Sequence, residues 1–336
     1  MPLSQPRAPI RLASCESAMP IAKAVARLLD TQLVATREFW FACGEGKFVF
    51  EENIRGSDLY IFQDPMTSVE GLSPYDRTMM ALHAIDAAVL ADVEHVTAIL
   101  PYFPGARQDK RKGRTREGIS ASLFARCFQA AGASRIVTLE IHNEAIAGMF
   151  EPRRCSLENL ELHTALSPWL ASRGLVGDVV ASPDVGGLER ARAYAADLDH
   201  NLVMLSKVRD YRTANRVVES ILIGDVTDKN VLLVDDIVDT GGSVVAAVEQ
   251  LKGGGARDII VTCAHPVFSG PAWERFEKLA AQAKAEGWSF QMVGTNAIHH
   301  ESTPSWYHAF DIAPLLARVI ASVNHRDSVT GAHAGL

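Results

Sequence analysis

The sequence has no apolar stretch long enough to cross a membrane, and it has few cysteines. No uncharged apolar run approaches the ~20 residues that a membrane-spanning helix needs. The N-terminus, MPLSQPRAPIRLAS, lacks the apolar core of a signal peptide. The five cysteines are odd in number, widely spread and form no CxxC pair, which favours a reducing cytosol over a disulfide framework or a zinc site. We therefore expect a soluble, cytoplasmic protein.

An excess of positive charge is also absent. The formal net charge of −7 argues against broad binding to nucleic acid or to anionic lipid, so we expect neither nucleic acid nor a membrane as a partner. Hydrophobic residues make up 48% and charged residues 22% of the chain, which are ordinary globular proportions. A length of 336 residues exceeds what a single core usually reaches, so two domains are expected.

Short runs rich in Val, Ile and Leu alternate with helix-like stretches along most of the chain. The predicted buried strands are Leu59–Gln63, Val96–Phe103, Arg135–Ile141, Val179–Ser182, Val231–Asp236 and Ile259–Cys263. The predicted helices are Ala18–Leu29, Tyr75–Val89, Ser120–Ala130, Gly187–Ala196, Gly242–Leu251 and Pro271–Ala285. This alternation predicts parallel sheets with helices on their faces, which bind ligands at the carboxyl ends of the strands.

The strongest single signal is VLLVDDIVDTGGS, which spans Val231–Ser243. Four apolar residues form a strand, the acids Asp235 and Asp236 follow, and the Thr-Gly-Gly-Ser segment opens a helix. Glycines allow close backbone approach to a phosphate, and free amides at a helix start favour an anion. A simple turn with an N-cap is the alternative interpretation. The ordered set of strand, paired acids, glycines and helix favours phosphate binding.

A second loop, within ILPYFPGARQDKRKGRTREGISA (Ile99–Ala121), is crowded with positive charge. Its six basic residues are Arg107, Lys110, Arg111, Lys112, Arg114 and Arg116. Such a run is often only a solvated surface loop. Here it follows a predicted buried strand at the ligand-binding edge of a sheet, which favours an anion site.

These motifs resemble those of the ribose-phosphate pyrophosphokinase (phosphoribosyl pyrophosphate synthetase) family. The glycine-containing loop resembles the phosphoribosyl pyrophosphate fingerprint, which type I phosphoribosyltransferases share, and the basic loop is similar to the synthetases' PYxxYARQD. The resemblance covers roughly residues 10 to 320. Its other segments are ENIRGSD (Glu52–Asp58), LEIHNEAIAGMFE (Leu139–Glu151), SPDVGGLERARAYA (Ser182–Ala195) and AHPVFSG (Ala264–Gly270).

The resemblance implies an α/β fold of two similar domains, each a mainly parallel sheet flanked by helices, as in type I phosphoribosyltransferases. We expect an N-terminal domain over 8–155 with the ATP-binding loop and a C-terminal domain over 156–324 with the ribose-5-phosphate loop. A flexible tail over 325–336 would follow. The segment Phe150–Leu160, with Pro152 and two arginines, is predicted to be the crossover between the halves.

The resemblance also implies the activity and the roles of single residues. Members of the family transfer pyrophosphate from Mg-ATP to the 1-hydroxyl of ribose 5-phosphate, giving phosphoribosyl pyrophosphate and AMP, and they form homo-oligomers, hexamers built from dimers. The cofactor would be Mg2+, held by His142 and Asp184, and the catalytic residues would be Lys207, Arg209 and His142. ATP would be bound by Phe41, Glu45, Arg107, Gln108 and Asp109. Ribose 5-phosphate would be bound by Asp235, Asp236, Asp239, Thr240, Gly241, Gly242 and Ser243.

Two segments depart from the family pattern and keep alternative functions open. In FACGE (Phe41–Glu45), Cys43 replaces an acid associated with the adenine amino group, and a thiol is a weak acceptor. The segment Pro65–Arg77, which belongs to assembly and regulatory surfaces in the family, is also altered. The alternatives are a non-catalytic regulatory paralogue and a diphosphokinase with a different nucleotide donor or ribose-phosphate acceptor.

Overall fold

The chain folds into two compact units. The structure is a computed structural model that describes residues 5–113, 115–210 and 216–330, and the side chains of residues 207–220 are outside this description. The first unit comprises the described residues up to Glu161, Ala297–His299, and the chain from Asp311 onward. The second unit comprises Leu162–Asn296 and His300–Phe310. The expected limits 8–155 and 156–324 differ from these units mainly in the placement of the C-terminal helix, and they stay a prediction.

The first unit is built on a parallel sheet of five strands in the order β1-β4-β5-β6-β7. The strands are β1 (Ile10–Ser14), β4 (Asp58–Phe62), β5 (His95–Ile99), β6 (Arg135–Leu139) and β7 (Ser156–Leu160). Every residue of β4 is buried, because this apolar strand lies between two others and has helices on both faces. Residues 156–160, expected in the crossover, instead form the edge strand β7.

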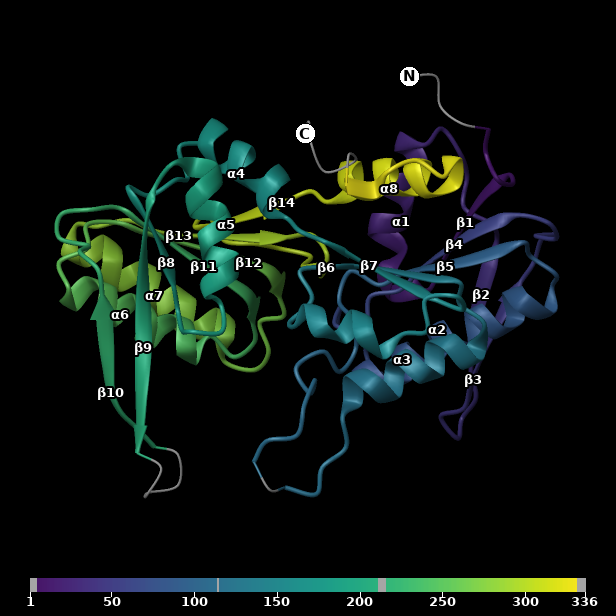
Figure 1. Cartoon of the computed structure of the whole chain (residues 1–336), viewed down its shortest axis with the longest axis horizontal. Helices are drawn as coiled ribbons and strands as arrows, with labels where there is room; N and C mark the ends of the chain where they lie inside the picture. The colour runs from purple at the N-terminus through teal and green to yellow at the C-terminus, as the bar shows by residue number, and fades with distance from the viewer. Residues whose placement is uncertain (1–4, 114, 211–215, 331–336) are drawn as a thin grey trace. The chain divides into compact units, whose positions relative to one another are not determined.

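The helices of the first unit cover both faces of its sheet (Figure 1). A capping box between Ser73 and Asp76 starts α2, and Gly132 (φ 100°) ends α3. The antiparallel hairpin β2–β3 packs beside α2. These elements are α1 (Met19–Leu28), α2 (Pro74–Leu90), α3 (Ser120–Ala131), α8 (Ala313–His325), β2 (Thr36–Trp40), β3 (Gly46–Phe50) and the short 3-10 helices η1 (Glu16–Ala18) and η2 (Glu144–Met149).

The second unit contains a sheet of seven strands in the order β10-β9-β8-β11-β12-β13-β14, parallel except for the β9–β10 pair. The strands are β8 (Val179–Ser182), β9 (Asn201–Asp210), β10 (Arg216–Ile223), β11 (Val231–Val238), β12 (Ile259–Pro266), β13 (Phe290–Thr295) and β14 (Tyr307–Phe310). The helices are α4 (His163–Ser172), α5 (Leu188–Leu198), α6 (Gly242–Gly253) and α7 (Ala272–Glu286). The predicted α/β class, with parallel sheets flanked by helices, is therefore confirmed.

No helix in the described ranges combines the length and the apolar character that a membrane span requires.

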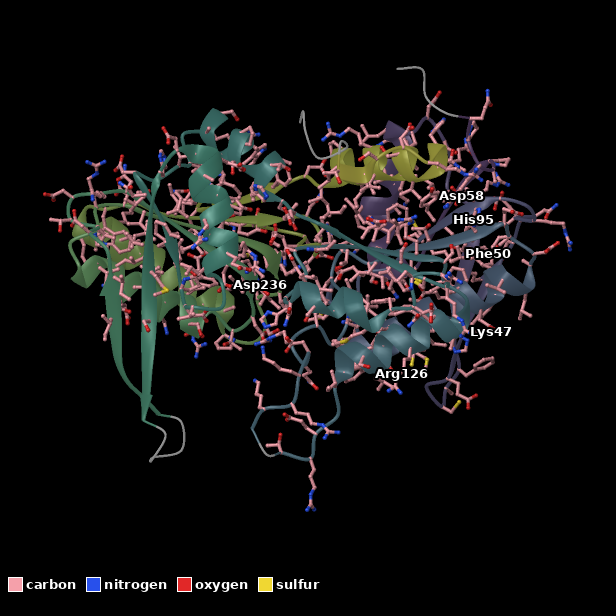
Figure 2. The ribbon with its side chains drawn as sticks, in the orientation of Figure 1. Lys47, Phe50, Asp58, His95, Arg126 and Asp236 are labelled. Atoms are coloured by element: carbon pink, nitrogen blue, oxygen red, sulfur yellow. The ribbon has the colours of Figure 1, made fainter. Side chains whose placement is uncertain are left out.

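A buried polar cluster ties both ends of the described chain to the sheet of the first unit. The Asp58 carboxylate is fully buried and accepts hydrogen bonds from Arg7 at 2.5 Å, from the Tyr60 hydroxyl at 2.6 Å and from Asn324 at 2.8 Å. His95, its register partner on β5, lies beside it (Figure 2), and burial lowers the pKa of that imidazole. Three donors thus compensate one buried charge.

We expect Asp58→Ala to destabilise the first unit by about 3–5 kcal/mol, because it leaves the Arg7 charge buried without its partner. Chemical denaturation of the intact chain measures this change. The matched control is Asp92→Asn, which removes an exposed ion pair with Arg55, tolerates the positive φ of 62° at that position and should cost no more than about 1 kcal/mol. Equal losses in the two variants would contradict a structural role for the buried cluster.

Candidate functional site

The acidic pair and the glycine loop lie at the carboxyl end of β11, where α6 begins. Gly241 has φ 77°, and a Cβ atom on it would lie 2.7 Å from the ring of Phe276, so both its conformation and its surroundings require glycine. No side chain of the described structure caps α6. The first amides of the helix, around the exposed Gly242 and Ser243, are therefore available to an anion.

Two carboxyl groups lie next to each other near the carboxyl end of β11. Burial and, next, the like charge of Asp236 raise the pKa of the Asp235 carboxyl well above its ordinary value. Asp236 is itself buried, and its carboxylate lies 3.8 Å from the guanidinium of Arg190 on α5 (Figure 2 labels Asp236). The arrangement places two acceptors and one cation beside the glycine loop, which suits a ligand with hydroxyl and phosphate groups.

Arg275 on α7 holds the loop itself. Its guanidinium donates to the Thr240 carbonyl at 2.7 Å and lies next to Gly242, where a Cβ atom would be 3.4 Å from its nitrogen. Asp239 and Thr240 complete the turn between the strand and the helix. A basic group fixed behind the loop adds positive potential to the anion-favouring helix start.

Asp184 follows β8, the parallel neighbour of β11, and therefore lies at the same edge of the sheet. One of its oxygens accepts from the Gly187 amide at 3.1 Å, and its carbonyl accepts from the Ser182 hydroxyl at 2.7 Å. These bonds fix an exposed carboxylate at the start of α5. Lys207 and Arg209 lie on β9, the next parallel strand, but their side chains fall outside the described residues.

In the first unit, the loops after β5 and β6 meet. The Asn143 amide donates to the Asp109 carboxylate, and Lys110 lies 3.6 Å from the same group. Burial would raise the pKa of Asp109, but the Asn143 bond, Lys110 and the nearby His142 together lower it below its ordinary value. The structure therefore brings Asp109 and His142 together, as members of adjacent loops.

Gln108 has a structural role in this loop. Its side-chain oxygen accepts from the Ser120 hydroxyl at 2.6 Å, which joins the loop to the start of α3. Gly105 (φ 74°) makes the turn, since a Cβ atom there would lie 2.8 Å from Ser120. Arg107 is exposed beside it. Arg114, one of the six basic residues, is outside the described residues.

Phe41 and Glu45 lie at the tip of the β2–β3 hairpin, joined by a 2.8 Å bond from the Phe41 amide to the Glu45 carbonyl. Figure 1 shows this hairpin and the loop after β5 at separate places of the first unit. A single chain thus does not bring the five predicted ATP-binding residues into one cluster.

His142, in the first unit, and Asp184, in the second, are the predicted metal ligands. Within the described ranges there is no group of three or more His, Cys, Asp or Glu side chains placed to hold a metal ion. Mg2+ in nucleotide sites takes one or two carboxylates together with phosphate oxygens and water, so a cage of protein ligands is not needed. The hard oxygen donors of Asp184 and of the acidic pair fit that ion.

Sequence reasoning did not identify Arg190, Arg275 and Asn143 as site residues. Arg190 falls inside the SPDVGGLERARAYA segment, and its place in the first turn of α5 could have marked it. Asn143 directly follows the predicted site residue His142, so its place in that motif could also have marked it. Arg275 had no local signal, because only the packing of α7 brings it to the loop.

The altered segment Pro65–Arg77 is organised by a buried carboxylate at the end of β4. Asp64 accepts from the Met66 amide at 2.8 Å and from the amide and hydroxyl of Thr67. Arg77 donates to the carbonyls of Pro65 at 2.9 Å and Leu72 at 2.7 Å. Burial raises the pKa of Asp64 to about 6 in spite of these bonds.

Comparisons with known proteins identify the family to which both halves of the chain are similar. Residues 10–132 match the family described as the N-terminal domain of ribose phosphate pyrophosphokinase, and residues 170–293 match the phosphoribosyl transferase domain family. The ribose-phosphate pyrophosphokinase of Corynebacterium efficiens is 37% identical over 92% of this chain and 91% of its own length. That of Bacillus subtilis is 32% identical over 96% of both chains.

A solved structure matches the fold over nearly the whole chain. The phosphoribosylpyrophosphate synthetase from Mycobacterium smegmatis has a TM-score of 0.82 and 32% sequence identity, covering 94% of this chain and 98% of its own. The match confirms the two-domain α/β fold that the sequence motifs predicted.

We expect Asp64 to make stability depend on pH. Its folded pKa of about 6 lies above the ordinary value of 3.8, so the folded state binds the extra proton between these values. Its stabilising contribution should be full below about pH 4 and be lost as the pH rises through about 6. Urea unfolding at several pH values should show this slope in the native chain and not in Asp64→Asn; an identical slope in both would contradict the assignment.

We expect Gly241→Ala to destabilise the second unit by about 1–3 kcal/mol, because it imposes strain at a positive φ and a clash with Phe276. Gly253→Ala, at the other end of α6, is the control, since its Cβ atom meets nothing within 4 Å. Thermal unfolding compares the two. A loss in both variants, or in neither, would refute the requirement for glycine at position 241.

Proposed function

The chain belongs to the ribose-phosphate pyrophosphokinase family, and we propose on that basis that this enzyme transfers the pyrophosphoryl group of Mg-ATP to the 1-hydroxyl of ribose 5-phosphate. The observation that carries the proposal is the acidic pair of β11 leading into the glycine loop of α6. In a chain that matches a ribose-phosphate pyrophosphokinase over 92% of its length, this element supports a sugar-phosphate subsite at the start of α6.

Ribose 5-phosphate would occupy the carboxyl edge of the second unit's sheet. Its phosphate would meet the amides and hydroxyls of Thr240–Ser243 at the start of α6, with Arg275 behind them. Asp235 and Asp236 would accept hydrogen bonds from the sugar hydroxyls. Asp239 completes this set of predicted contacts. The Arg190 guanidinium near Asp236 supports the geometry, because it holds one carboxylate of the pair in place.

ATP would be held by the first unit. Arg107 and the other exposed cations of the loop after β5 suit the triphosphate, and Asp109, fixed by Asn143, anchors the loop. The tip of the β2–β3 hairpin, with Phe41 and Glu45, would bind the adenine. Magnesium, held by His142 and Asp184, would neutralise charge on the phosphates.

In the reaction, the 1-hydroxyl oxygen bonds to the β-phosphorus and loses its proton, while the bond from that phosphorus to the oxygen shared with the α-phosphate breaks. AMP carries that oxygen away. Lys207 and Arg209, on the strand next to Asp184, would neutralise the charge that develops on the moving phosphates. Such a step needs positioning more than covalent catalysis.

The enzyme would act as a homo-oligomer. Within one chain the hairpin tip and the loop after β5 are apart, so a second copy would supply the hairpin to complete the ATP site. Light scattering that finds only monomers under assay conditions would exclude this part of the proposal.

We expect the purified chain to release AMP from Mg-ATP only when ribose 5-phosphate is present, with phosphoribosyl pyrophosphate as the co-product. Coupled detection of AMP, with and without the sugar phosphate, measures this dependence. Robust AMP release without the sugar would contradict the proposal, and no turnover would favour the non-catalytic paralogue.

The variant Lys207→Ala tests the proposed catalytic role of Lys207 in the same AMP-release assay. Loss of one charge-neutralising group should lower the rate by roughly 100-fold to 1,000-fold. Lys229→Ala, which removes a surface pair with Asp225 on the same unit, should leave the rate unchanged. Equal rates in the two variants would exclude Lys207 from catalysis.

A further inference from the structure

The outer face of the β2–β3 hairpin carries a row of aromatic and cationic side chains. Phe39 and Lys47 are direct cross-strand partners. Arg37, on β2, and Phe41, directly after the end of β2, flank Phe39 at alternate positions. The Arg37 guanidinium lies 4.5 Å from the centre of the Phe39 ring. Because alternate residues of a strand share a face, these four side chains form one surface.

The inner face of the hairpin is packed, and this packing fixes the outer row. Phe48 is buried in the core cluster that also contains Met80 of α2, and Trp40 packs against it. A Cβ atom on Gly46 would lie 2.8 Å from Met80 and 3.0 Å from Trp40, so the ribbon lies directly on α2. The strand residues of the outer row, Arg37, Phe39 and Lys47, therefore lie on a ribbon whose other face is packed against α2.

Lys47 is the cation placed to meet a ligand of this surface. Its ammonium lies 4.7 Å from the centre of the Phe39 ring and 5.7 Å from that of Phe41. Phe41 is 51% exposed, an unusual state for so large an apolar ring. Arg37 is paired with Glu51 at 2.5 Å, whereas no carboxylate of the described residues forms an ion pair with Lys47.

An exposed ring beside such a cation has the chemistry of a purine subsite. A planar base stacks on an aromatic ring about 3.5 Å away, which would bring its edge within reach of the Lys47 ammonium. An ammonium donates to N7 and to a 6-oxo group, the acceptors of guanine and hypoxanthine. The exposed thiol of Cys43, in the same turn, is a weak acceptor for the 6-amino group of adenine.

We propose that Lys47 is a specificity-determining residue that lets this enzyme bind 6-oxopurine nucleoside triphosphates as pyrophosphoryl donors besides ATP. This inference rests on the proposed function, because it assumes that the hairpin tip receives the donor's base. Glu45 keeps one carboxylate in the turn, so adenine remains a ligand. The nucleotide preference is broadened towards guanine and hypoxanthine and not exchanged.

The test is equilibrium binding of two non-transferable donors, the α,β-methylene analogues of ATP and GTP, measured by calorimetry on the intact chain. We expect dissociation constants within about ten-fold of each other for the native chain. Lys47→Met should weaken the binding of the GTP analogue roughly ten-fold more than the binding of the ATP analogue, which is the effect of one lost contact to the purine edge. Both analogues carry the same phosphates, so the loss of one positive charge affects the two dissociation constants equally. The ratio of these constants therefore reports only on the base.

Two further variants complete the test. Cys43→Asp should shift the ratio towards the ATP analogue, because a carboxylate accepts from a 6-amino group and repels a 6-oxo group. Lys278→Met, which removes an exposed lysine paired with Glu274 on α7, should leave the ratio unchanged.

An equal loss of affinity for both analogues in Lys47→Met would overturn the inference. So would a native chain that binds the GTP analogue more than about 100-fold more weakly than the ATP analogue. Failure of the proposed function is distinguishable, because binding of these analogues requires no turnover.

Discussion

The common direction of the strands is the constraint on which the placement of the candidate site residues within each unit depends. Because β8, β9 and β11 run parallel, the loop of Asp184, the segment of Lys207 and Arg209, and the glycine loop begin at one edge of one sheet. In the first unit, parallel pairing of β5 and β6 places the Asp109 loop beside Asn143 in the same way. A single antiparallel exchange among these strands would send one loop to the opposite edge.

The elements predicted from sequence are those whose signals are local. All six predicted strands and all six predicted helices are present, with boundaries that mostly shift by a few residues. Buried parallel strands such as β4 and β12 are rich in apolar residues, and a strand that is followed by glycines marks its own loop. The fold class and the glycine loop could therefore be predicted before any contact was known.

Other features could not be predicted, because they depend on partners far away in the chain. The last helix, α8, returns to the first unit, where the Asn324 amide reaches Asp58 across 266 positions. Neither residue carries a local sign of that bond. Arg275 likewise reaches the Thr240 carbonyl only through the packing of α7, and Lys47 meets the two phenylalanine rings only through the register of the hairpin.

The reaction proposed for the chain is an attack on the β-phosphorus of ATP, whereas an ordinary kinase directs the attack at the γ-phosphorus. The two reactions therefore give different products. The most direct measurement is 31P nuclear magnetic resonance of a reaction with ATP, magnesium and ribose 5-phosphate. Pyrophosphoryl transfer predicts that the α-phosphorus appears as AMP, while the β- and γ-phosphorus appear together as a diphosphate on carbon 1 of the sugar. Formation of ADP, with a new monophosphate in place of the diphosphate on carbon 1 of the sugar, would contradict the account.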